Sequence, residues 1–103
     1  MIRVVALITA KPGKRAEVLA AFRANMPAVL AENGCVEYVP VIDAPGIGPV
    51  QTPLGPHAFA VIETWSSAEA LAAHGAAPHM KAYAAKVRDL LESRIVHVLT
   101  PAT

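Results

Sequence analysis

The chain has 103 residues, of which 54% are hydrophobic and only 17% are charged, and its formal net charge is +1. This length provides for a single domain, residues 1–103, because two hydrophobic cores could not be built from so few residues. The positive charges are scattered rather than gathered in a stripe, so nucleic-acid binding has no support. No run of about 18 uncharged apolar residues exists, so no membrane span is predicted.

The single cysteine, Cys35, excludes an intrachain disulfide and a cysteine metal cluster. Because free Cys is commonly buried, we expect it to act as a small hydrophobe rather than as a nucleophile. The apolar run near the N-terminus ends at Lys11 without the small-residue cleavage site of a signal peptide. We therefore interpret this run as a strand and expect a cytoplasmic protein.

The first half of the chain predicts a strand followed by a long helix. Ile2 to Ala10 is apolar on both sides, which is typical of a strand covered on both faces. After a turn, apolar residues recur every three or four positions and predict a helix that Asn33 and Gly34 end. Pro27 lies inside this helix and predicts a kink or a new turn. The apolar stripe of the helix consists of Val18, Leu19, Phe22, Met26, Val29 and Leu30.

The middle of the chain predicts two strands separated by a loop. Cys35 to Ile42 is the second predicted strand, and Pro40 indicates an edge or irregular position. Asp43 to Pro56 is rich in proline and glycine and predicts a loop. His57 to Trp65 is the third predicted strand, and its odd-numbered residues, Glu63 included, share one face.

Two short helices are predicted after the third strand. The capping-box spacing of Ser66 and Glu69 predicts a helix that ends at His74, where Gly75 can cap it. Pro78 is favoured in a first helical turn and begins the next helix. The residues that we expect this second helix to bury are Met80, Tyr83, Ala84, Val87, Leu90 and Leu91.

With a last strand from Arg94 to Leu99, the element order is βαββαβ. This order predicts an α+β fold of ferredoxin-like type, a four-stranded antiparallel sheet with helices on one face. All four strands carry apolar residues on both faces, so the open face of the sheet is too apolar to meet water. We therefore expect a homodimer through the open sheet face, which would also add burial to a small domain.

Several sequence runs match a known family. They are the run from Glu32 to Tyr38, Asp43, the run from Phe59 to Trp65, the run from Leu71 to His74, and Pro78-His79. With these features the chain resembles the antibiotic biosynthesis monooxygenase family of dimeric α+β barrels, especially its small quinol-monooxygenase-like members. The resemblance implies a dimeric barrel that oxidises a small phenolic, quinol or anthrone-like aromatic with O₂, without flavin, metal or haem.

The residues that could perform such chemistry are His74, His79 and Glu63. An oxygenase without a cofactor must first deprotonate its substrate, which requires a base, donors for the anion and an apolar pocket. His74 and His79 flank the break between the two short helices, and imidazoles suit this role. Each could instead satisfy local backbone groups. Glu63 lies among apolar strand residues and needs a partner, so it is either catalytic or structural.

The candidate pocket residues are Trp65, Tyr83 and Phe59, each of which could equally belong to the core. His57 and His97 lie on strands without a supporting motif, and we interpret them as structural. No metal-binding, phosphate-binding or nucleophile-elbow motif occurs, so no cofactor is implied.

Two other functions stay open. The first is a non-catalytic dimeric barrel that binds a small ligand or supports stress tolerance. The second is an isomerase that uses the same pocket and a histidine base. The loop from Asp43 to Pro56 could line or cover the pocket in any of these cases.

Overall fold

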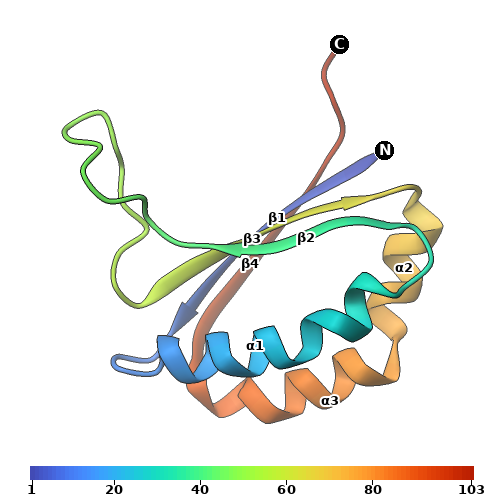
Figure 1. Cartoon of the computed structure of the whole chain (residues 1–103), viewed down its shortest axis with the longest axis horizontal. Helices are drawn as coiled ribbons and strands as arrows, with labels where there is room; N and C mark the ends of the chain where they lie inside the picture. Colours follow the sequence, from blue (N-terminus) through green and yellow to red (C-terminus); the bar gives the residue numbers. More distant parts are fainter.

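The computed structural model describes all residues, 1–103. Four strands form one antiparallel sheet in the order β2-β3-β1-β4, and the helices cover one face of it (Figure 1). The elements are β1 (Ile2–Ala10), α1 (Arg15–Leu30), β2 (Cys35–Val41), β3 (Ala58–Trp65), α2 (Ala68–Ala76), α3 (Pro78–Val87), a short 3₁₀ helix (Arg88–Leu90) and β4 (Leu91–Leu99). This confirms the predicted βαββαβ order with its second helix in two parts.

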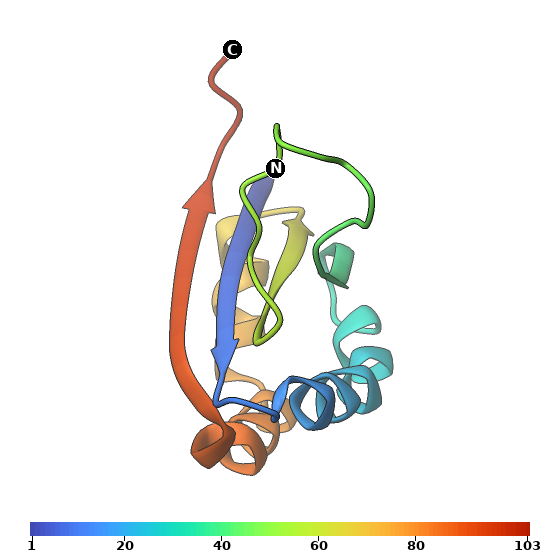
Figure 2. The same ribbon diagram turned by 90° about the vertical axis from the view of Figure 1, so that its left-hand side faces the viewer.

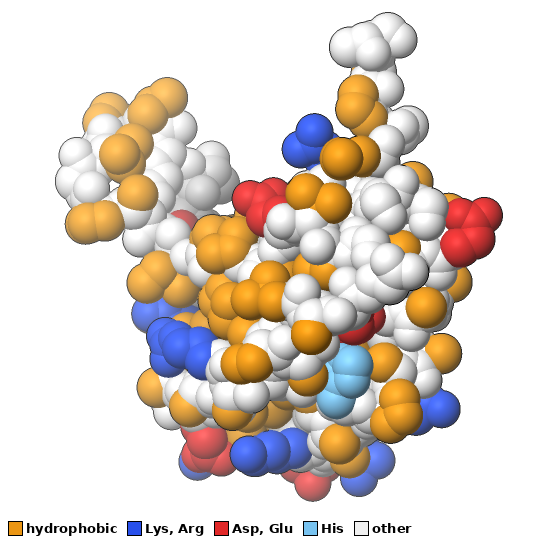
Figure 3. All heavy atoms as spheres, turned by 45° about the vertical axis from the view of Figure 1, so that its right-hand side comes forward, with side chains coloured by type: hydrophobic (Ala, Val, Ile, Leu, Met, Phe, Trp, Pro, Cys, Tyr) orange, Lys and Arg blue, Asp and Glu red, His pale blue; other side chains and the backbone are white.

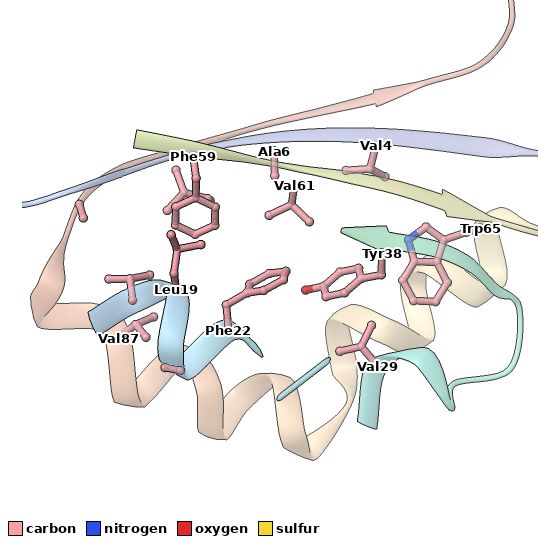
Figure 4. Close-up of a cluster of buried hydrophobic side chains, with 14 residues drawn as sticks. Val4, Ala6, Leu19, Phe22, Val29, Tyr38, Phe59, Val61, Trp65 and Val87 are labelled. Atoms are coloured by element: carbon pink, nitrogen blue, oxygen red, sulfur yellow. The ribbon is translucent and has the colours of Figure 1, made fainter. Parts of the chain in front are cut away.

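The central strands β1 and β3 give the sheet two distinct faces. Their register pairs Ile8 with Phe59 and Val4 with Glu63, so alternate residues of each strand point toward the helices. Figure 4 shows Phe59 and Trp65 on this helix-facing side. The predicted alternation of β3 is therefore confirmed, and it places an acidic residue, Glu63, inside the molecule.

Helix α1 supplies most of the cover for this face. Leu19, Phe22 and Val29 point from α1 toward the sheet (Figure 4). The predicted stripe is buried except for Met26, which is half-buried, and Leu30, which is 50% exposed. The helix continues through Pro27 rather than ending there. The apolar period thus predicted the packed face correctly and missed only the last turn.

The two short helices differ in detail from the prediction. The N-cap of α2 is Ser67 rather than Ser66, because the Ser67 side chain accepts a hydrogen bond from the Ala70 N–H at 3.1 Å. Helix α2 then runs past Gly75 to Ala76. Pro78 begins α3 as predicted.

The apolar residues of α3 and the start of β4 are less buried than expected. Val87 is buried, while Met80, Tyr83, Leu90 and Leu91 are half-buried against the core, and Ala84 is exposed. Strand β4 begins at Leu91 rather than at Arg94. The helix period continues to Leu91, so the pattern alone assigned this residue to the helix.

Gly34 holds the turn after α1 against the start of α2. Its φ of +88° is in the left-handed region, and a Cβ there would lie 2.5 Å from the Ala70 Cβ and 2.6 Å from the Ser66 Oγ. The Ser66 N–H also donates to the Gly34 carbonyl at 2.8 Å. Only glycine fits this contact, which fixes the position of the neighbouring Glu32.

The loop between β2 and β3 projects away from the helix layer (Figures 1 and 2). Its base is tied, because the Asp43 carboxylate accepts the N–H groups of Leu54 and Gly55 at 2.8 and 2.9 Å. Its tip carries apolar side chains into solvent (Figure 3), among them Val50, which is 85% exposed. The loop therefore does not cover the interior between the helices and the sheet.

The open face of the sheet carries exposed apolar side chains, as predicted. Val39 in β2 is 36% exposed, and Ile95 and Leu99 in β4 are 51% and 47% exposed. None of the helices combines the length and the apolar character that a bilayer span requires.

Candidate active site

One carboxylate, Glu32, joins the two histidines that flank the helix break. Its Oε2 lies 2.9 Å from His74 Nδ1 and 2.7 Å from His79 Nε2. His74 lies near the end of α2 and His79 in the first turn of α3, and extended backbone at Ala77 turns the chain between them. Pro78 thus creates the corner that lets side chains from two helices meet at one acid.

The carboxylate determines where the protons of both rings lie. An ionised carboxylate only accepts hydrogen bonds, so the His74 Nδ1–H and the His79 Nε2–H donate to Glu32. The lone pair of neutral His79 is then on Nδ1, and that of neutral His74 is on Nε2. Each ring can accept a proton on the side that faces away from Glu32, and the carboxylate would stabilise the resulting positive charge.

His74 lies inside the molecule against two aromatic rings. It is 6% exposed, its ring centroid lies 4.6 Å from that of Trp65 at a tilt of 37°, and Tyr38 meets it edge-on at 5.5 Å. These contacts fix the ring plane of His74. The ring therefore serves Glu32 as an immobile donor.

Glu63 is buried beside this pair and is held by Trp65. The Trp65 Nε1–H donates to Glu63 Oε1 at 2.9 Å. Burial raises the pKa of the Glu63 carboxyl above its ordinary value, although the Trp65 hydrogen bond and the charges of His74 and Arg94 act in the opposite direction. Glu63 does not contact Glu32, so the three predicted catalytic residues form two adjoining hydrogen-bonded groups rather than one.

The predicted pocket residues Phe59 and Tyr83 both pack on Phe22. The Phe22 ring meets Phe59 and Tyr83 edge-on at centroid distances of 5.9 and 6.0 Å, and it stacks on Tyr38 at 5.1 Å. Phe59 has no exposed surface and lines no cavity, so it is a core residue that packs against Phe22. Figure 4 shows Tyr38 between Phe22 and Trp65.

His79 is the member of the Glu32 group that reaches a cavity. This cavity of about 230 Å³ lies between α1 and α3, and Asn25, Tyr83 and Lys86 line it together with His79. Burial raises the pKa of the Tyr83 hydroxyl to about 12, which keeps it a neutral donor near pH 7. The cavity thus offers an imidazole lone pair, a hydroxyl, an amide and an ammonium group to a small ligand.

Sequence reasoning did not assign Glu32, Tyr38, Phe22 or Asn25 to the site. Glu32 lies just beyond the end of α1, and the sequence marks it only as the first residue of a run that carries the family resemblance. Its partners are 42 and 47 residues away in sequence, so no local pattern announces the contact. Gly34 predicts only the end of the helix, and its close approach to Ala70 is seen only in the structure.

Cys35 and the metal-ligating residue types give no further candidate site. Cys35 is half-buried, and burial raises the pKa of its thiol, which disfavours the reactive thiolate. No group of three or more His, Cys, Asp or Glu side chains is arranged to hold a metal ion.

Comparisons with known proteins agree with this architecture. A family model described as "Antibiotic biosynthesis monooxygenase" matches residues 1–86. The chain is 39% identical over 104 residues to the Escherichia coli K12 protein named "Probable quinol monooxygenase YgiN", with 98% of each chain covered.

Solved structures of other proteins have the same fold. A Pseudomonas aeruginosa protein superimposes with a TM-score of 0.82 at 25% identity, covering 99% of this chain and 94% of that one. A Mycobacterium tuberculosis protein gives a TM-score of 0.80 at 28% identity, covering 99% and 95%.

Proposed function

The chain belongs to the antibiotic biosynthesis monooxygenase family, and from this premise we propose that it oxidises a small quinol or related hydroxylated aromatic with O₂. The base is His79, and the substrate hydroxyl binds in the cavity between α1 and α3. The Escherichia coli relative named "Probable quinol monooxygenase YgiN" motivates the choice of a quinol.

The observation that carries this proposal is the contact between Glu32 and His79 at 2.7 Å. It leaves the His79 Nδ1 lone pair available on a ring that lines the cavity of about 230 Å³ between α1 and α3. The hydroxyl proton passes to Nδ1, and the imidazolium that forms keeps its Nε2–H on the Glu32 carboxylate. The electron-rich phenolate then passes an electron to O₂, which the closed-shell phenol cannot readily do.

The buried residues act through this base rather than on the substrate. His74 donates to the same oxygen of Glu32 and holds the carboxylate toward His79. The Trp65 ring packs against the His74 ring, and Glu63 accepts a hydrogen bond from Trp65. We therefore assign His74, Glu63 and Trp65 as positioning residues, and Tyr83 as a donor in the cavity.

Oxygen uptake with menadiol and with an anthrone tests this assignment. His79→Ala should lower kcat by about 10² to 10⁴-fold, the usual contribution of a general base. His57→Ala is the matched control, because His57 is exposed and precedes β3, at the opposite end of that strand from Trp65. A His79→Ala rate equal to that of wild type would overturn the role of His79.

A non-catalytic ligand-binding protein is the competing function. It is favoured by the fact that every buried side-chain nitrogen and oxygen already has a hydrogen-bond partner, because a satisfied network needs no substrate. Ligands that raise Tm without being consumed would support it. Product formation without oxygen consumption would instead indicate an isomerase that uses the same histidine.

We also propose the predicted homodimer through the open sheet face. Ile95 and Leu99 of β4 and Val39 of β2 leave apolar surface in water that a second copy would bury. Light scattering at micromolar concentration should give twice the chain mass. A mass of 10.8 kDa would contradict the dimer. The expected cytoplasmic location stays a prediction.

A further inference from the structure

A second and larger cavity lies between α3 and β4. Its volume of about 580 Å³ is within the 300 to 1,000 Å³ range of small-molecule sites. Six of its nine lining residues are hydrophobic. These six are Met80, Tyr83, Ala84, Ala85, Val87 and Leu91. Such a wall suits a ring system of more than one ring.

The three other lining residues, Lys81, Arg88 and Arg94, are all cations, and no acidic residue lines the cavity. Arg88 has a partial partner in Asp89 at 3.9 Å, where both side chains are exposed. Lys81 and Arg94 make no ion pair and no hydrogen bond within the chain. Glu63 is the acidic residue whose carboxyl feels the charge of Arg94, but no direct contact joins them, so the N–H groups of Arg94 and Lys81 are available to a ligand.

Strand register places Arg94 on the interior side of the sheet. Arg94 pairs with Ile8 of β1, which points toward the helices, so the Arg94 side chain leaves the strand on the side of α3. Lys81 and Arg88 approach from α3. Positive charge thus comes from both walls of one apolar hollow.

We propose that this cavity binds an organic monoanion, a carboxylate on an apolar body of about two fused rings. The rings pack against Met80, Val87 and Leu91, and the carboxylate accepts hydrogen bonds from Arg94, which can bind it through two parallel N–H groups. Lys81 adds charge at the rim.

This inference goes beyond the proposed function, because the anion site is a separate cavity that His79 does not line. Tyr83 connects the two sites, because its ring lines this cavity and the cavity of His79. A ligand bound to Arg94 would therefore lie against Tyr83, which also lines the cavity of His79.

Calorimetric titration with redox-inert probes tests the site without any turnover. The wild-type protein should bind 2-naphthoate about tenfold or more tightly than the uncharged 2-naphthamide, as expected for a charge-assisted hydrogen bond. Arg94→Gln should remove this preference. Arg23→Gln, which deletes an exposed cation on α1, is the matched control and should retain it.

Three outcomes would overturn the inference, and two of them come from the comparison of the two probes. One is equal or absent binding of the two probes by wild type, and the other is an unchanged preference in Arg94→Gln. Ala84→Leu fills the cavity from an exposed helix position and should weaken both probes without lowering Tm. Normal binding by this variant would place the anion elsewhere. Oxygen uptake is measured separately, so failure of the anion site and failure of the oxygenase are distinguishable.

Discussion

The helix-facing side of β3 has two ends that are built differently. At its start, Phe59 packs in a wholly apolar region with Leu19 and Val87 (Figure 4). At its end, Glu63 and Trp65 lie beside His74 in a buried polar group. One strand therefore supplies both a conventional core and the support of the candidate active site.

The difference shows what each end contributes. The apolar end gains free energy from burial and close packing. The polar end gains little net stability from its hydrogen bonds, but each of its groups would be destabilising without a partner. A protein that needed only stability would continue the apolar pattern, so the polar end is where function is expected.

The largest effect on stability is expected at the apolar end. Phe59→Ala should lower the free energy of unfolding by about 3 to 5 kcal/mol, because a fully buried ring leaves a cavity. Urea denaturation measures this loss. Val50→Ala, at an exposed loop position, should change stability by less than about 0.5 kcal/mol. A similar small change at Phe59 would contradict the account of this end.

A smaller loss of stability and a larger loss of function are expected from Glu32→Ala. Two imidazole N–H groups lose their acceptor, which should lower the free energy of unfolding by about 1 to 3 kcal/mol. Glu17→Ala is the control, since its pairing with Lys14 at 4.0 Å is solvent-exposed. If the two variants were equally stable, Glu32 would not be holding the histidines.

Coupling between Trp65 and Glu63 should be about 1 kcal/mol, the usual net value of a buried hydrogen bond. A double-mutant cycle with Trp65→Phe and Glu63→Leu measures it by denaturation. Leucine removes the acceptor with little change in volume. Strictly additive losses would show that the bond contributes nothing.

The smallest effect is a pH dependence from Glu63. Burial raises its folded-state pKa above the ordinary value of 4.5, so between the unfolded and folded pKa values the native state binds a proton that the unfolded chain has lost. Stability therefore falls as pH rises through this window. Glu63→Gln does not titrate, and its stability relative to wild type should rise from pH 4 toward pH 7. The opposite slope would mean that the folded-state pKa is lowered.

The sequence predicted the residues around Glu32 better than it predicted Glu32 itself. Alternation in β3 placed Glu63 and Trp65 on the interior face, and Pro78 brought His74 and His79 to one corner, because both signals are local. Glu32 could not be found in this way, since its role depends on how the turn at Gly34 packs against α2.

The strand boundary at Leu91 was missed for a different reason. Leu90 and Leu91 fit the helical period as well as a strand, and only the pairing of Leu91 with Ala10 decides between them.

The central claim is that Glu32 joins His74 and His79 into one unit, and its most direct test is a double-mutant cycle on oxygen uptake with a quinol. His74→Ala, His79→Ala and the double variant are compared by kcat. Residues that act as a unit are not additive, so the double variant should lose little more activity than His79→Ala alone. Losses that multiply, or a His74→Ala rate equal to that of wild type, would contradict the claim.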